Sequence, residues 1–182
     1  MKKSIRRMLS GGDRRSIGRS GDAVARVQKD PALFGEVIRA MEDEDPIVRM
    51  RAADAAEKIS AASPGLLRPW KKFLLKRIAP IPQQEVRWHV ARMLPRLRLS
   101  PGDKASAVRI LTAYLEDESR IVKTFALQGL ADLAEGDPAL RARVVRLAEG
   151  FLRGGSPALR SRSRKILACL GEKSGIPEKR GP

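Results

Sequence analysis

Few residues of this chain have the chemistry of a catalytic or metal site. His89 is the single histidine, so a histidine metal cluster or a Ser–His–Asp triad would need substitutes for histidine. Its place on the flank of a helix favours a helix–helix hydrogen bond. Cys169 is the single cysteine, which excludes an intramolecular disulfide and a cysteine zinc site. Gly154-Gly155 is typical of a turn, not of a phosphate-binding loop. We therefore expect a non-catalytic protein without metal or cofactor.

Basic side chains are the other group that could carry a function. The chain has 37 Lys and Arg against 21 Asp and Glu, for a formal net charge of +16. The excess is concentrated in residues 1–20, 63–98 and 153–182. Such blocks suit a polyanion or an acidic protein. By helical angle the middle block spreads over several faces, so an ordinary solvated surface is the alternative. The candidate polyanion contacts are Lys71, Lys72, Lys76 and Arg96.

One apolar pattern recurs four times and indicates the elements that position these residues. From Val86, apolar residues stand at offsets 0, +4, +7, +8 and +11, which form one stripe of an α-helix. The same offsets from Val48 and Val122 give apolar or small residues, and from Leu159 they give a looser copy. A single helix pair cannot bury such a stripe, so the pairs must stack. We expect an all-α array of about four helix pairs, at about 30–62, 64–98, 101–135 and 137–171.

The remaining segments flank this array. Residues 1–21 are expected to be a basic N-terminal arm, 22–171 the repeat domain with a short helix at its start, and 172–182 a disordered tail. Within the second pair, one helix is expected from about Leu66 to Ile78. No apolar run approaches 18 residues and no signal-peptide core follows the N-terminus, so we expect a cytoplasmic protein that does not span a membrane.

The turns within the pairs carry a recognisable motif. An Asp in the turn precedes Val-Arg or Val-Lys at the start of the second helix, with Leu159-Arg160 as a looser copy. The pattern resembles HEAT repeats and is similar to small bacterial HEAT-repeat proteins without assigned chemistry. The resemblance implies an armadillo-like, right-handed α-α superhelix and a stacking ladder between repeats. Ile81 and Gly154 replace the turn Asp, so the ladder should be complete only in repeats one and three. Its members would be Asp43, Arg49, Arg87, Asp117, Lys123 and Arg160.

The same resemblance implies a binding surface, because the second helices of HEAT pairs line the concave side. At 100° per residue, offset +2 points away from the apolar stripe and offset +6 lies beside it. Trp88 is therefore expected to project outward, where it could stack on a base, a guanidinium or a partner's side chain. The alternative is that Trp88 folds over Met50 and the neighbouring helix as part of the packing. The candidate surface is Met50, Asp54, Trp88, Arg92, Thr124, Gln128 and Lys165.

Three functions fit these features. The preferred one is a non-catalytic scaffold that binds a protein partner, such as an acidic helix or tail, on the concave face. The second is a nucleic-acid-binding protein that uses the basic arms and the basic second repeat. The third rests on a similarity of fold type to bacterial alkylpurine DNA glycosylases, which use HEAT-like helices with concave Trp, Asp and Arg. Asp54, Trp88 and Arg92 are the only residues here that could form such a set.

Overall fold

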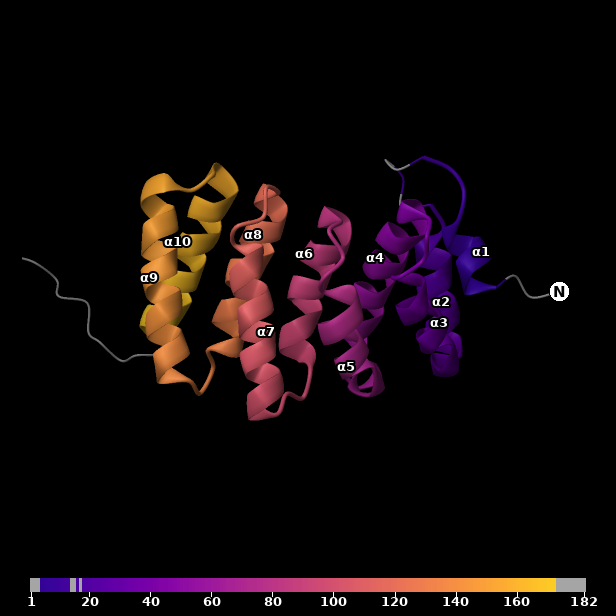
Figure 1. Cartoon of the computed structure of the whole chain (residues 1–182), viewed down its shortest axis with the longest axis horizontal. Helices are drawn as coiled ribbons and strands as arrows, with labels where there is room; N and C mark the ends of the chain where they lie inside the picture. The colour runs from indigo at the N-terminus through magenta and orange to yellow at the C-terminus, as the bar shows by residue number, and fades with distance from the viewer. Residues whose placement is uncertain (1–3, 14–15, 17, 173–182) are drawn as a thin grey trace, which may run out of the picture.

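The chain folds into a row of helices that follow one another in sequence order (Figure 1). The computed structural model describes residues 4–13, 16 and 18–172, and within them the regular structure is entirely helical, as expected. No helix in this part of the chain has the length and apolar character needed to cross a membrane. The α-helices are α1 (Ile5–Leu9), α2 (Ser20–Lys29), α3 (Phe34–Ala40), α4 (Pro46–Ala62), α5 (Lys71–Phe73), α6 (Gln84–Met93), α7 (Pro101–Tyr114), α8 (Arg120–Leu133), α9 (Pro138–Gly154) and α10 (Pro157–Glu172).

The helices form two layers. The second helices of the pairs, α4, α6, α8 and α10, contact one another in this order, and we call them the B layer. The first helices, α3, α5 with the turns that flank it, α7 and α9, form the A layer. Each pair thus packs on the next through its B helix.

The recurring apolar stripe is the surface that the pairs bury. The five stripe residues of the second pair are at most 7% exposed: Val86, Val90, Met93, Leu94 and Leu97. The stripes counted from Val48 and Val122 are buried as well, while Leu167 and Leu170 of the last pair are only half-buried. A fully buried apolar side chain contributes about 1.5–3 kcal/mol. The last stripe is less covered because α10 has a B-layer neighbour on one side only.

Helix starts follow the local sequence. Asp45 is the N-cap of α4, where its carboxylate accepts a hydrogen bond of 2.8 Å from the N–H of Ile47, and Pro46 is the first helical residue. Asp137 caps α9 in the same way, at 3.0 Å. Ser119 precedes α8, but its side chain makes no capping bond; instead the Asp117 carboxylate accepts the Ser119 N–H at 2.8 Å.

The first helix of the second pair differs from the expected continuous helix over 66–78. It consists of a 3₁₀ segment (η2, Pro64–Trp70), the single α-turn α5, and a π-helical turn (η3, Leu74–Ile78). Pro69 inside η2 lacks an N–H for regular helical bonding. Trp70 also packs directly on Gly35, where a Cβ would stand 2.7 Å from the indole ring.

The expected N-terminal arm is folded onto the first pair over its described part. Helix α1 buries Ile5, Met8 and Leu9 in the core, and α2 packs along α4. Residues 1–3, 14–15 and 17 of the arm lie outside the described residues. Of the tail expected over 172–182, only Glu172 is described, as the last residue of α10.

A buried arginine on α4 holds the segment between α1 and α2. Arg51 is 2% exposed, and a buried guanidinium must have its donors satisfied. It donates hydrogen bonds of 2.5 to 3.1 Å to the carbonyl oxygens of Leu9, Gly11, Asp13 and Ser16. Gly18 has a φ of +53°, and a Cβ there would lie 2.6 Å from Cζ of Arg51. The backbone thus wraps closely around one side chain.

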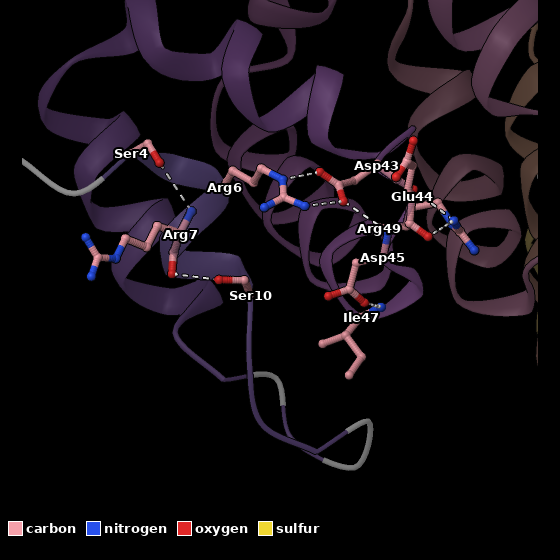
Figure 2. Close-up of polar contacts among 9 residues, drawn as sticks. All are labelled: Ser4, Arg6, Arg7, Ser10, Asp43, Glu44, Asp45, Ile47 and Arg49. Carbon is pink, nitrogen blue, oxygen red and sulfur yellow. Dashed lines mark hydrogen bonds and ion pairs between the residues drawn. The ribbon is translucent and has the colours of Figure 1, made fainter.

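The expected ladder begins with an arginine outside the repeat motif. Nε and Nη2 of Arg6 on α1 donate to the two carboxylate oxygens of Asp43, at 2.6 and 3.0 Å (Figure 2). This contact, more than any other, lowers the pKa of Asp43. Arg49 donates instead to the Asp43 carbonyl at 2.8 Å and, with Nε, to Oε1 of Gln83 in the next pair at 2.7 Å. Gln83 therefore supplies the acceptor in a repeat whose turn lacks the Asp.

Arg87 repeats this arrangement one pair further on. Its Nε donates to the Ile81 carbonyl of its own turn at 3.1 Å, and its Nη1 to Oδ2 of Asp117 in the next turn at 2.7 Å. Each of the two arginines therefore joins its own turn to the following one. Because each of these guanidiniums is only partly exposed, the links are better shielded from solvent than fully exposed ion pairs.

The ladder ends at the turn of the third pair, at Asp117, and does not reach the last pair. Arg160 donates to the Gly155 carbonyl of its own turn at 3.0 Å. Among the described residues, no side chain accepts a hydrogen bond from Lys123, consistent with Gly154 standing at the Asp position.

Helices α6 and α8 approach each other closely at Gly129, and a substitution there tests how tightly the pairs stack. A Cβ on Gly129 would lie 2.8 Å from the Ala91 carbonyl oxygen and 3.1 Å from Cδ1 of Leu111. We expect Gly129→Ala to destabilise the protein by about 1–3 kcal/mol through overpacking, although alanine is the better helix former. Urea unfolding followed by circular dichroism measures the change. Gly150→Ala is the control, since a Cβ there meets nothing within 4 Å and should leave stability equal or higher. Equal stabilisation by both substitutions would contradict the close helix approach.

Candidate binding groove on the B helices

Three of the residues expected on the binding surface are engaged or covered within the fold. Thr124 is buried, and its hydroxyl donates to a backbone carbonyl of its own helix at 2.7 Å. Asp54 accepts hydrogen bonds of 2.8 Å from Ser20 and Lys58. Met50 is half-buried. The cause on α4 is helix α2, which packs along it. The Thr124 hydroxyl, by contrast, is engaged by a hydrogen bond to the backbone of its own helix.

Trp88 does not project freely from α6. Its ring stacks on His89 with centroids 3.4 Å apart, and on Phe125 of α8 with centroids 5.4 Å apart and planes at 26°. The side chain is half-buried and packs against the core. Trp88 is thus part of the packing between neighbouring helices, as the alternative interpretation held in general, but the partner shown on the neighbouring helix is Phe125 of α8 and not the expected Met50.

Phe125 lies at the centre of a cluster of aromatic and arginine side chains on the B layer. The guanidinium of Arg92 on α6 lies 5.2 Å from the ring centroid, and that of Arg162 on α10 lies 5.8 Å from it, so three helices converge on one aromatic ring. A cleft of about 350 Å³ opens here, which we call the Phe125 cleft. Its lining residues are Ala91, Arg92, Pro95, Arg96, Phe125, Gln128, Gly129, Asp132 and Arg162.

A buried carboxylate holds one wall of the cleft. Oε1 of Glu57 on α4, with a side chain 5% exposed, accepts from Nη2 of Arg96 at 2.6 Å and lies 3.2 Å from Nη2 of Arg92. Nη1 of Arg96 also donates to the Glu57 carbonyl and to Ser60, at 2.9 and 3.0 Å. Removing one partner of such a buried pair costs about 3–5 kcal/mol, so Arg96 has a structural role. Among the described carboxylates, Glu57 alone pairs with Arg92, whose guanidinium keeps donors for another group.

The other wall is held by polar contacts along α8. Nη1 of Arg162 donates to Oε1 of Gln128 at 2.9 Å, and Nε2 of Gln128 donates to Oδ1 of Asp132 at 2.6 Å. These two bonds orient the Arg162 guanidinium beside the Phe125 ring before any ligand arrives. Pre-orientation of this kind lowers the entropic cost of binding.

A second cleft continues from the first along α8. It has a volume of about 620 Å³ and shares Pro95, Gln128 and Asp132 with the Phe125 cleft. Lys165 lines it from α10, one helical turn beyond Arg162, next to the exposed thiol of Cys169. Together the two clefts form one groove, which contains three of the expected residues: Arg92, Gln128 and Lys165.

Phe125 and Arg162 were absent from the expected surface because both stand at offset +3 of their helices. The groove lies at the junctions between neighbouring B helices, so its side chains come from the helix flanks. The face opposite the stripe, at offset +2, supplied Thr124 and Trp88 instead. The sequence did contain one signal: Arg92 and Gln128 at +6 are followed by Arg96 and Asp132 at +10, one turn along the same flank.

The expected polyanion contacts do not form one surface. Lys71 pairs with Asp103 and donates to the Arg98 carbonyl at 3.4 Å, and Arg96 lies in the B layer with Glu57. Lys72 and Lys76 are exposed on the A layer.

Asp54, Trp88 and Arg92, the set considered for glycosylase chemistry, contact Lys58, Phe125 and Glu57 respectively. Within the described part of the chain, no three histidine, cysteine or carboxylate side chains come together as a metal site requires. We compared the chain with protein-family models, with characterised proteins and with solved structures, and none of the three comparisons found a match. No relative therefore supplies a function for the groove.

His89 lies beneath Trp88 and is 2% exposed. Within the described residues its Nδ1 has no hydrogen-bond partner, so the expected helix–helix bond through this atom is not formed. Burial lowers the pKa of His89 to about 3; the nearby Arg92 and Lys58 act in the same direction, and Asp54 opposes them. The imidazole is therefore neutral at physiological pH.

This burial predicts a pH-dependent stability. The unfolded chain binds a proton near the ordinary pKa of 6.5, and the folded chain does so only near 3. The stabilisation is thus present above about pH 6.5 and is lost as the pH falls toward 3. We expect the free energy of unfolding to drop by about 2 kcal/mol between pH 7 and pH 5. Urea titrations at several pH values measure this drop, and His89→Phe should remove most of it. An equal drop in that variant would assign the effect to other groups.

Proposed function

We propose that this chain is a non-catalytic, HEAT-like scaffold that binds a protein partner in the groove of its B layer. The proposal includes the geometry that the HEAT resemblance implies, a right-handed superhelix with the B helices on its concave side. The observation that carries it is the Phe125 cleft, in which two arginines from different helices lie 5.2 and 5.8 Å from the centre of one aromatic ring.

The cleft chemistry favours an acidic segment that also carries apolar side chains. Arg92 and Arg162 offer N–H donors close to the Phe125 ring, and a guanidinium binds a carboxylate with two parallel hydrogen bonds. The ring itself and Pro95 offer apolar contact. Buried aromatic and arginine residues are also those that dominate binding energy in protein interfaces. An acidic helix or tail that places a carboxylate one turn from a leucine would satisfy both parts.

A labelled peptide tests the proposal directly. The probe is a fluorescein-labelled helical peptide of Glu and Leu, and its counterpart has Gln in place of Glu. We expect the Glu peptide to bind at least tenfold more tightly. Arg162→Gln should weaken its binding about tenfold or more, equivalent to about 1.4 kcal/mol. Fluorescence anisotropy measures both.

Arg164→Gln is the matched control, because it removes the same charge from an exposed position on the same helix. It should leave peptide binding within about twofold of the original. Phe125→Ala gives a second variant of the cleft that leaves the net charge unchanged. If Arg162→Gln and Arg164→Gln lose equal affinity, the peptide responds to net charge and the groove assignment is wrong.

A further inference from the structure

The A layer carries a basic surface that the proposed function does not use. Helices α5, α7 and α9 follow one another along the row (Figure 1). We define the A-layer patch by five exposed side chains on α5, η3, α7 and α9: Lys72, Lys76, Arg109, Arg143 and Arg146.

Contacts bring these residues to one surface. Lys72 and Lys76 stand one helical turn apart and line, together with Arg109 of α7, a cleft of about 410 Å³. Nη2 of Arg143 on α9 donates to Oγ1 of Thr112 at 3.1 Å, and Thr112 lies one turn beyond Arg109 on α7. Arg146 follows Arg143 by three residues and shares its face of α9. The patch therefore spans three neighbouring A-layer elements.

The positive charge of this patch is not neutralised within the fold. Other basic residues of the same layer hold carboxylates: Lys71 pairs with Asp103, Arg77 with Glu42 and Lys104 with Asp137. No described carboxylate lies within ion-pair distance of any patch residue.

Two of the described carboxylates can be placed next to the patch. Asp103 lines the Lys72 cleft and is already held by Lys71. Glu149 lies one turn from Arg146 on α9 without an ion pair to it, so the patch keeps an excess of positive charge.

We propose that the A-layer patch binds the phosphate backbone of double-stranded nucleic acid without reading its sequence. Lysine and arginine side chains are phosphate ligands. The hydroxyls of Ser106 and Thr112 donate to backbone carbonyls of their own helix, so the five basic side chains supply the phosphate contacts. Three neighbouring helices at about 8–10 Å spacing cover roughly 20 Å. Over that length a duplex carries about one negative charge per 1.7 Å, so several phosphates face the patch at once.

Other polyanions fit the surface less well. Binding of single strands depends on aromatic side chains that stack on bases, and binding to a membrane surface depends on apolar anchors. In the described part of the chain the one exposed large apolar residue is Ile121, which belongs to α8 in the B layer. The surface thus offers charge without stacking or insertion, as contacts to a duplex backbone require.

Salt-dependent binding tests the proposal. The probe is a fluorescein-labelled DNA duplex of mixed sequence, about 20 base pairs long, titrated with the full chain at 50 to 200 mM NaCl. The triple variant Lys72→Gln/Arg109→Gln/Arg143→Gln should lose at least tenfold in affinity at 100 mM NaCl. The slope of log K against log salt should become shallower by about 2–3, since each phosphate contact adds about 0.9.

The control variant is Arg7→Gln/Lys29→Gln/Arg164→Gln, which removes the same charge from exposed positions on α1, α2 and α10. It should keep its affinity within about threefold and most of its salt slope. Unchanged circular dichroism and melting temperature in both variants establish that the fold is intact.

Three results would overturn the proposal. The first is equal loss in the patch and control variants, which would mean that only net charge matters. The second is a patch variant that binds the duplex as tightly as the original chain. The third is a triple variant that loses binding to phosphatidylserine vesicles, or to a single strand of the same sequence, but still binds the duplex. The patch would then bind another polyanion. None of the patch residues lines the Phe125 cleft, so failure here would leave the groove proposal standing.

Discussion

The structure depends on a single constraint: no helix pair in this chain can bury its apolar stripe alone. Val86, Val90 and Met93 are fully buried in a stack where α4 and α8 both contact α6. The stack therefore has to continue until something else covers its ends. At the N-terminal end α1 and α2 provide that cover, with Ile5 and Leu9 in the core. At the other end α10 has a single B-layer neighbour, and Leu167 and Leu170 at the end of its stripe remain half-buried.

Arginine takes three different roles here, and the surrounding acceptors decide which. Arg51 is enclosed by backbone carbonyls and orders the segment before α2. Arg87 links the turns of successive pairs through Asp117. Arg162 and Arg109 keep donors at a groove and at an open surface. Because the guanidinium is charged under all relevant conditions, it must find acceptors or remain at the surface. The basic residues of the chain are thus divided between those held by acceptors within the fold and those whose donors remain at the surface.

Much of the fold could be predicted from local patterns. The stripe periodicity placed the B helices and their buried residues, and the turns with Asp or Ser before Pro marked where α4, α7, α9 and α10 begin. Such signals work because helix period and capping depend on residues within about four positions of one another. The irregular segment before Ile78 escaped prediction, since its course depends on Pro69 and on Trp70 packing against Gly35, a distant residue.

The candidate site was predicted only in part. Arg92, Gln128 and Lys165 were placed on the binding surface from their helical offsets, and all three line the groove. The prediction that Thr124 is accessible was wrong, because this residue is buried and its hydroxyl donates a hydrogen bond to the backbone of its own helix.

The sequence by itself determined which helix faces are apolar and where helices start. Tertiary structure alone decided that Glu57 pairs with Arg96 and that Phe125 meets Arg162, because these partners come from different helices and their distance along the chain carries no periodic signal.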